Sequence, residues 1–194
     1  MRTSEIKRKT AETDIELFLD LDGNGSSKIN TGCPFLDHML TLFARHGDFT
    51  LNVNCKGDTQ VDYHHTAEDI AICLGDAFKE ALGDMKGITR YGSFILPMDE
   101  SLVLCAIDLC GRPYLQFECD FTAAKVGDME TELAREFFYA VSYSAGINLH
   151  IKMLTPGNNH HMMEAMFKAF GKALDMATGL DERVTDVLST KGSL

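Results

Sequence analysis

Two long stretches of the chain carry apolar residues at intervals of three and four positions. Ile70, Leu74, Ala77, Phe78, Ala81 and Leu82 follow this spacing in the first stretch, and Met163, Phe167, Phe170, Leu174 and Ala177 follow it in the second. On an α-helix such positions share one face. We therefore predict helices over 65–82 and 160–177, ending near Gly83 and Gly179, because glycine is favoured just after a helix.

Shorter elements precede each of these helices. Alternating apolar and polar positions predict a strand over 12–21, and Asp22-Gly23-Asn24-Gly25 after it is typical of a hairpin turn. Pro34 favours the start of a helix over 34–45. The remaining predicted elements are strands over 49–54, 94–97, 102–109, 114–119 and 147–153, and a helix over 130–144.

The second half of the chain repeats the first. The segment 12–23 resembles 100–111 at an offset of 88 residues, and 35–47 resembles 136–146 at an offset near 99. Such self-similarity indicates an internal duplication, interrupted mainly by extra loop around 120–129. We predict an α+β fold of one domain, 1–194, made of two pseudo-repeats, about 1–90 and 91–194. Each repeat would run β-β-α-β-α, with the helices packed between the two halves.

Charge and composition narrow the function classes. The net charge of −11 argues against binding to nucleic acid or to an anionic membrane surface, which are normally contacted by basic patches. No apolar run approaches the length of a membrane span, and the charged N-terminus lacks the apolar core of a secretory signal. Six cysteines without a Cys-x-x-Cys pair indicate core residues in a reducing compartment. We expect a cytoplasmic protein.

One polar motif occurs twice, at the start of both long helices. His64, His65 and Glu68 form His-His-x-x-Glu, and His160, His161 and Glu164 repeat it 96 residues later. On a helix, the first histidine and the glutamate share a face, whereas the second histidine points about 100° away. An adjacent histidine pair is ordinarily a surface or capping feature, but its repetition favours metal binding. Imidazoles with carboxylates suit Mn, Fe, Co or Zn.

Three further residues are candidates for the same site. His38 lies in an otherwise apolar helix and is either a core histidine paired with Asp37 or a metal ligand supported by it. The duplication places Glu136 or Phe137 opposite His38, so Glu136 is the candidate equivalent ligand. Glu12 is either an outward-facing strand residue or a general base beside the metal.

A phosphate-binding set is also present in this acidic chain. Its members are Arg90, Arg112, Lys168 and the C-terminal Ser189-Thr190-Lys191-Gly192. Guanidinium, ammonium and backbone donors together can clamp a phosphate. Each cation taken alone is more readily explained as a solvated surface charge.

Four blocks together resemble one family, the imidazoleglycerol-phosphate dehydratases of histidine biosynthesis. They are 31–40 (TGCPFLDHML), 62–69 (DYHHTAED), 159–170 (NHHMMEAMFKAF) and 189–192 (STKG). The resemblance covers nearly the whole chain. It implies dehydration of D-erythro-imidazole-glycerol phosphate to imidazole-acetol phosphate with two Mn²⁺ ions per site. It also implies a duplicated fold like ribosomal protein S5 domain 2, and a cubic homo-oligomer built from trimers with active sites at subunit contacts.

The resemblance implies roles for individual residues. The metal ligands would be His38, His64, His65, Glu68, Glu136, His160, His161 and Glu164, with Glu136 at a position that is histidine in many relatives. The substrate contacts would be Glu12, Arg90, Arg112, Lys168, Ser189 and Lys191. Glu12 would move the proton, so the catalytic set is Glu12 with His64, His65, His160 and His161.

Two other functions fit the same motifs. A two-metal phosphate-ester hydrolase would release phosphate. A dehydratase would instead form a ketone that still carries its phosphate. A non-catalytic metal-binding protein is the second alternative. Four-helix di-iron proteins carry Glu-x-x-His on long helices, and here the order is His-His-x-x-Glu on helices interleaved with strands.

Overall fold

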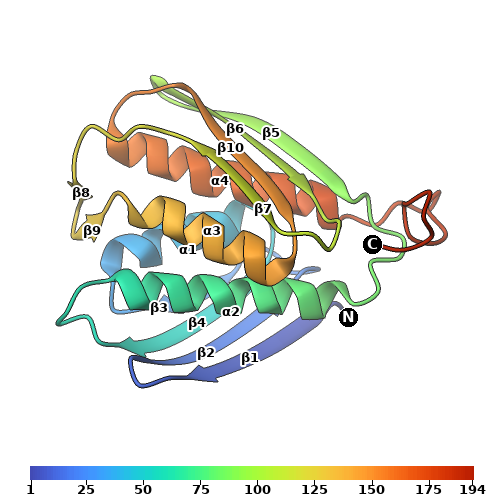
Figure 1. Ribbon diagram of the computed structural model, residues 1–194, viewed down its shortest axis with the longest axis horizontal. Coiled ribbons are helices and arrows are strands. Elements are labelled where there is room, and N and C mark those ends of the chain that lie inside the picture. The colour runs from blue at the N-terminus through green and yellow to red at the C-terminus, as the bar shows by residue number, and fades with distance from the viewer.

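Two β-sheets enclose four helices in the computed structural model, which describes residues 1–194 (Figure 1). The first repeat contains β1 (Thr3–Lys9), β2 (Thr13–Asp20), β3 (Ser27–Asn30), α1 (Pro34–His46), β4 (Thr50–Gly57) and α2 (His64–Leu82). The second contains β5 (Tyr91–Met98), β6 (Ser101–Asp108), β7 (Tyr114–Glu118), α3 (Leu133–Ala145), β10 (Asn148–Thr155) and α4 (Asn159–Thr178). Two short strands, β8 (Lys125–Val126) and β9 (Met129–Glu130), form a separate hairpin before α3.

The two main sheets have the same topology. Their strand orders are β1-β2-β4-β3 and β5-β6-β10-β7. In each, the last pair is parallel and the other two pairs are antiparallel. Register also repeats, because Arg8 pairs with Ile15 in the first sheet and Leu96 pairs with Val103 in the second. The predicted α+β class and the internal duplication are confirmed.

The strand count and one turn differ from the prediction. Each repeat has three strands of its main sheet before its first helix, so the order is β-β-β-α-β-α apart from the β8–β9 hairpin. The predicted hairpin at Asp22–Gly25 is wrong: the segment leads into β3, which pairs with β4 and not with β2. The edges of β2 are already occupied by β1 and β4. Likewise α3 begins at Leu133, later than predicted, because Met129–Glu130 pairs with Lys125–Val126.

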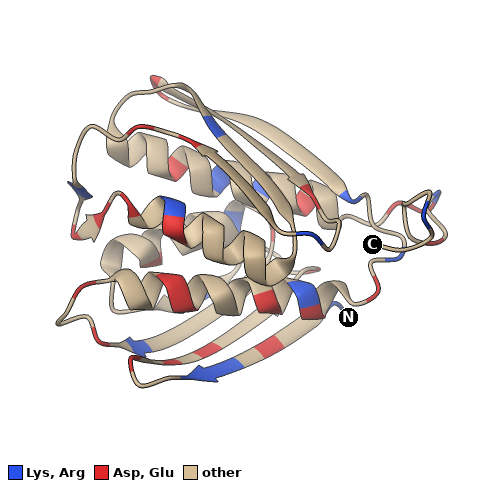
Figure 2. Ribbon diagram, in the orientation of Figure 1, with Lys and Arg blue, Asp and Glu red and all other residues tan.

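Burial explains why these residues form these elements. Along β2, Ile15, Leu17 and Leu19 are buried and the residues between them are more exposed, which is the period of a sheet with one face on the core. The helices lie between the sheets in Figure 1 and bury their apolar faces there. Figure 2 shows charged residues on the outer strands and on the exposed sides of the helices.

Aromatic side chains join the two repeats at the centre. The rings of Phe43 on α1 and Phe170 on α4 stack with centroids 5.3 Å apart. Phe78 and Phe138 extend this cluster to α2 and α3. Burying each such side chain stabilises the fold by roughly 1.5–3 kcal/mol, so the repeats are held together by their shared core. None of the helices combines the length and the hydropathy that crossing a membrane demands.

Candidate active site

Both His-His-x-x-Glu motifs lie at the start of a helix, and in each a side chain two residues before the first histidine accepts the backbone N–H of that histidine. The Asp62 carboxylate accepts the backbone N–H of His64 at 2.8 Å, and the Asn158 side chain accepts that of His160 at 2.9 Å. Asn158 is the N-cap of α4, where Asn is favoured because it satisfies a free N–H group of the first turn. Asp62 lies one residue before Tyr63, the N-cap of α2. These hydrogen bonds fix the backbone from which the histidines project.

Three of the predicted ligands come together between α1 and α4. Nε2 of His38 lies 2.8 Å from Oε1 of Glu164, and Nε2 of His160 lies 3.1 Å from the same oxygen. One ligand atom from each residue lies within 4.8 Å of the other two. Oε2 of Glu164 accepts a hydrogen bond from Lys168 at 2.6 Å. We call His38, His160 and Glu164 the primary group.

The carboxylate of the primary group is held ionised. Burial by itself would raise the pKa of Glu164, which is only 8% exposed. Hydrogen bonds from Lys168, His38 and His160 outweigh burial and lower that pKa to about 2. A divalent ion competes with protons for such a ligand, so a carboxylate that is already ionised is suited to metal binding.

A second group surrounds His161. Its Nδ1 lies 3.0 Å from Oε2 of Glu100 and 3.9 Å from Oδ2 of Asp99. The backbone N–H of Asn158 donates to Glu100, and this contact does most to lower the pKa of Glu100 to about 2. Neither acidic residue was predicted as a site residue. The repeat could have revealed Glu100, because it aligns with Glu12.

His65 has the corresponding arrangement in the first repeat. Its Nε2 lies 3.6 Å from Oε1 of Glu12, and its Nδ1 lies 2.9 Å from Oδ2 of Asp58. The hydrogen bond to Asp58, with the charge of Glu12, raises the pKa of His65. The duplication therefore preserves a glutamate beside the second histidine of each motif. Asp58 was missed by the sequence analysis, and no pattern in the sequence marks it.

The remaining predicted ligands are not gathered with these. His64, His65, Glu68 and Glu136 belong to neither group of three potential ligands. Oε1 of Glu136 lies instead 3.2 Å from Nη1 of Arg135. Within one chain the structure thus joins His38 of the first repeat to the motif of the second, and it leaves the motif of the first repeat and Glu136 apart from them.

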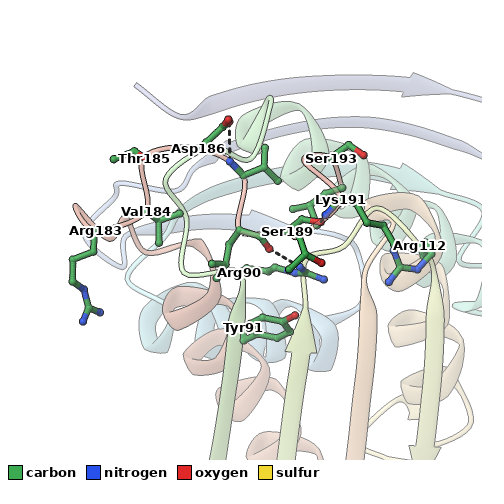
Figure 3. A pocket seen from close by; sticks show the side chains of 14 residues that line it. Arg90, Tyr91, Arg112, Arg183, Val184, Thr185, Asp186, Ser189, Lys191 and Ser193 are labelled. Carbon is green, nitrogen blue, oxygen red and sulfur yellow. Dashed lines mark hydrogen bonds between the residues drawn. The ribbon is translucent and has the colours of Figure 1, made fainter.

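Four of the predicted phosphate contacts line one cavity of about 770 Å³ (Figure 3). They are Arg90, Arg112, Ser189 and Lys191. Arg90 donates to the Asp108 carboxylate at 2.7 Å and to the Leu188 carbonyl at 2.6 Å. The hydrogen bond to Asp108 raises the pKa of Arg90, so the guanidinium is fixed and charged.

The other two predicted substrate residues lie outside this cavity. Lys168 is paired with Glu164 in the primary group, and Glu12 lies beside His65. Arg183 lines the cavity without having been predicted. It forms an ion pair with Asp181 at 2.6 Å, and in Figure 3 it points away from Arg90 and Arg112.

A strap, residues 120–132, connects the starts of the two motif helices. The backbone N–H of Thr122 donates to the side chain of Asn159, which precedes His160. The hydroxyl of Tyr63, which precedes His64, donates to Asp128 at 3.1 Å. The sequence analysis identified 120–129 only as extra loop and placed 130–132 in a helix. Its β8–β9 hairpin gives it a defined shape.

Fold and site together define a class of protein. Its members have a duplicated α+β fold, histidine–carboxylate groups at the starts of helices and a separate basic cavity. The family model of the imidazoleglycerol-phosphate dehydratases matches residues 31–174, and the chain belongs to that family. It is therefore a hydro-lyase of histidine biosynthesis, and the resemblance stated from the sequence is confirmed.

Relatives and solved structures of this family match over nearly the whole chain. The chain is 62% identical to the imidazoleglycerol-phosphate dehydratase of Lachnoclostridium phytofermentans, with 100% of this chain and 98% of that one covered. It is 55% identical to that of Bacillus subtilis, with both chains fully covered. The crystal structure of the Staphylococcus aureus protein matches with a TM-score of 0.84 and 40% identity, covering 92% of this chain and 99% of that one. The structure from Pyrococcus furiosus, in complex with (S)-C348, matches with a TM-score of 0.85 and 36% identity over 97% and 100% of the two chains.

Proposed function

We propose that the chain converts D-erythro-imidazole-glycerol phosphate to imidazole-acetol phosphate in the cytoplasm, and that it uses two Mn²⁺ ions per active site. The observation that carries the metal requirement is the primary group, in which two imidazoles face one ionised carboxylate oxygen. The cytoplasmic location is in keeping with six cysteines that are all free.

The donor set fits Mn²⁺, because imidazole and carboxylate are both accepted ligands of this ion. His38, His160 and Glu164 would hold one ion. His64, His65, Glu68, Glu136 and His161 complete the proposed ligand set. A bound divalent ion would supply Lewis acidity that favours the imidazolate form of the substrate.

Glu12 is proposed to move the proton. The reaction removes a hydroxyl from the carbon next to the imidazole and a proton from the following carbon, and the resulting enol becomes the ketone by moving one proton. A general acid or base must reach these carbons. Glu12 is half exposed, and its carboxylate lies beside His65, so it can serve a substrate whose imidazole sits among the histidines.

Substrate phosphate is proposed to bind in the basic cavity. Arg90, Arg112, Ser189 and Lys191 would contact it there. Lys168 is proposed to contact substrate from the primary group, where it now neutralises Glu164. Binding energy from a remote phosphate fixes the reacting carbons in place, and such fixation lowers the barrier.

The active site is proposed to be completed by neighbouring subunits in a cubic oligomer built from trimers. Within one chain, the proposed ligands His64, His65, Glu68 and Glu136 lie in neither group of three potential ligands, which supports this proposal. Light scattering on the purified protein measures the mass. A monomer with full activity would contradict the assembly.

The deciding experiment uses metal-stripped protein. Imidazole-glycerol phosphate is added with and without Mn²⁺, and both the ketone and free phosphate are measured. Ketone that forms only with Mn²⁺ supports the proposal, whereas release of phosphate would favour a hydrolase. Glu12→Gln is expected to abolish turnover while substrate still binds. Retained turnover would remove Glu12 from the acid–base role.

A further inference from the structure

An ion pair between a buried carboxylate and a partly exposed arginine lies next to the loop that carries Glu12. The Asp69 carboxylate, next to Glu68 on α2, is 6% exposed. Its Oδ1 accepts hydrogen bonds from Nη2 and Nε of Arg8 at 2.9 and 3.1 Å. Its Oδ2 accepts the hydroxyl of Thr13 at 2.5 Å. One carboxylate thus joins α2 to the strands on both sides of the loop.

The hydrogen bonds continue from Thr13 to Glu12 in a fixed direction. A carboxylate only accepts, so Thr13 must donate to Asp69. Its oxygen is then left to accept from Thr10, whose Oγ1 lies 3.2 Å away. The same Thr10 oxygen accepts the backbone N–H groups of Glu12 and Thr13 at 3.1 and 3.0 Å. The Asp69 carboxylate therefore fixes the direction in which the hydroxyls of Thr13 and Thr10 donate. The Thr10 oxygen in turn binds the backbone of the loop 10–12.

The second repeat shows what the fold needs at these positions. Leu96, Ser101 and Ala165 stand where the first repeat has Arg8, Thr13 and Asp69, and all three are buried. The second repeat therefore builds the same strand, loop and helix with a leucine and an alanine in place of the ion pair. The fold alone does not require the pair in the first repeat.

The loops themselves explain the difference. Glu100, the counterpart of Glu12, is anchored directly, because its carboxylate accepts the backbone N–H of Asn158 and contacts His161. Glu12 has no such anchor on its carboxylate, which contacts only His65 at 3.6 Å. Its side chain stays free to move a proton, and its position has to come from the backbone.

We infer that Asp69, acting through Thr13 and Thr10, is a positioning residue that holds Glu12 beside His65. The inference rests on the proposed role of Glu12. It assigns the Arg8–Asp69 pair to the geometry of the reaction.

The test compares two substitutions of Thr13. Thr13→Val keeps the shape and removes the hydroxyl, whereas Thr13→Ser keeps the hydroxyl. In T13V, kcat is expected to fall at least about tenfold, since small misplacements of reacting groups are costly. KM and the number of Mn²⁺ ions bound per chain should not change. In T13S, kcat should stay within about twofold of the wild-type value, a difference in barrier of only about 0.4 kcal/mol. Asp69→Asn, which cannot accept from Thr13 in the same way, should behave like T13V.

A matched control and a second measurement keep the outcomes distinct. Thr178→Val removes another buried threonine hydroxyl, at the far end of α4, and should leave kcat unchanged. Hydrogen exchange of the peptide 9–14 should accelerate in T13V and D69N but not in T13S. Unchanged exchange and unchanged kcat in T13V would overturn the inference. A wild-type protein that forms no ketone would overturn the proposed function instead, and exchange would still report on the positioning of the loop.

Discussion

His38 and Glu164 are 126 positions apart in the chain, and Nε2 of one lies 2.8 Å from Oε1 of the other. The contact exists because α1 of the first repeat packs against α4 of the second, around the stacked rings of Phe43 and Phe170. A residue from each repeat thus contributes to one candidate metal site. The shared aromatic core holds the two residues in register.

Glu164→Gln is expected to weaken Mn²⁺ binding more than about tenfold, since even supporting residues of metal sites have effects of that size. It should also destabilise the protein by about 1–3 kcal/mol, because the largely buried Lys168 loses its partner. Calorimetric titration with Mn²⁺ measures the first effect and urea unfolding of the metal-free protein the second. Glu182→Gln, at an exposed position, is the control. Unaltered Mn²⁺ affinity in E164Q would remove Glu164 from the ligand set.

The sequence alone predicted the parts of the fold that have strong periodicity. The long apolar stripes of α2 and α4 and their repetition are visible in one dimension. The strand β1 was missed because only Ser4 on it is buried and the remainder is largely charged. The chain does turn at Asp22–Gly25, but this turn does not join two paired strands. The strand after it, β3, pairs with β4, and that choice depends on tertiary packing.

The same division holds for the site. The motif residues were found from spacing, because i and i+4 share a helix face. Asp58 and Asp99 lie on loops, and they reach His65 and His161 only through the packing of strands against helices. Glu100 was within reach of the sequence, because the duplication aligns it with Glu12. The separation of Lys168 from the basic cavity required the structure.

Arg112 is expected to contribute strongly to phosphate affinity, because few of its donors are occupied within the protein. Its guanidinium has one weak hydrogen bond, to the Cys110 carbonyl at 3.4 Å, so its donors are available to a ligand. Arg112→Met should raise KM roughly tenfold to a hundredfold, the cost of about 1.5–3 kcal/mol for a charged hydrogen bond. Steady-state kinetics measures this. Lys28→Met, on the outer face of the first sheet, controls for the loss of one positive charge, and an equal rise in KM there would contradict a specific contact.

His46 is expected to make the protein less stable in mild acid. Burial lowers the pKa of His46 below its ordinary value of 6.5, and the nearby Lys168 and Lys172 add to this effect. The unfolded chain then binds the proton more readily than the folded chain. Stability that is complete above about pH 6.5 is therefore lost as the pH falls through the folded-state pKa.

The substitution His46→Gln tests this sign. Between pH 7 and pH 5 the free energy of unfolding should fall more steeply for wild type than for H46Q, by up to about 1.4 kcal/mol per pH unit, the limit for one proton. Urea unfolding of the metal-free proteins at several pH values gives the two slopes. Identical slopes would show that His46 takes up its proton equally well in the folded state.

The strap is expected to support the metal site without supplying a ligand. Tyr63→Phe removes the hydrogen bond to Asp128, and Asn159→Ala removes the contacts with Thr122. Each loss should cost about 1 kcal/mol of stability. Because these residues precede His64 and His160, the freed first turns of α2 and α4 should also bind Mn²⁺ several-fold more weakly, as when supporting residues of other metal sites are lost.

Tyr143→Phe is the matched control for this prediction, since Tyr143 is an exposed tyrosine on α3 outside the strap. Its removal should leave Mn²⁺ affinity unchanged. Hydrogen exchange of 120–132 is expected to accelerate in Y63F and N159A only. Faster exchange with unaltered Mn²⁺ affinity would mean that the backbone hydrogen bonds to Asp62 and Asn158 are sufficient to orient the histidines. The strap would then contribute stability alone.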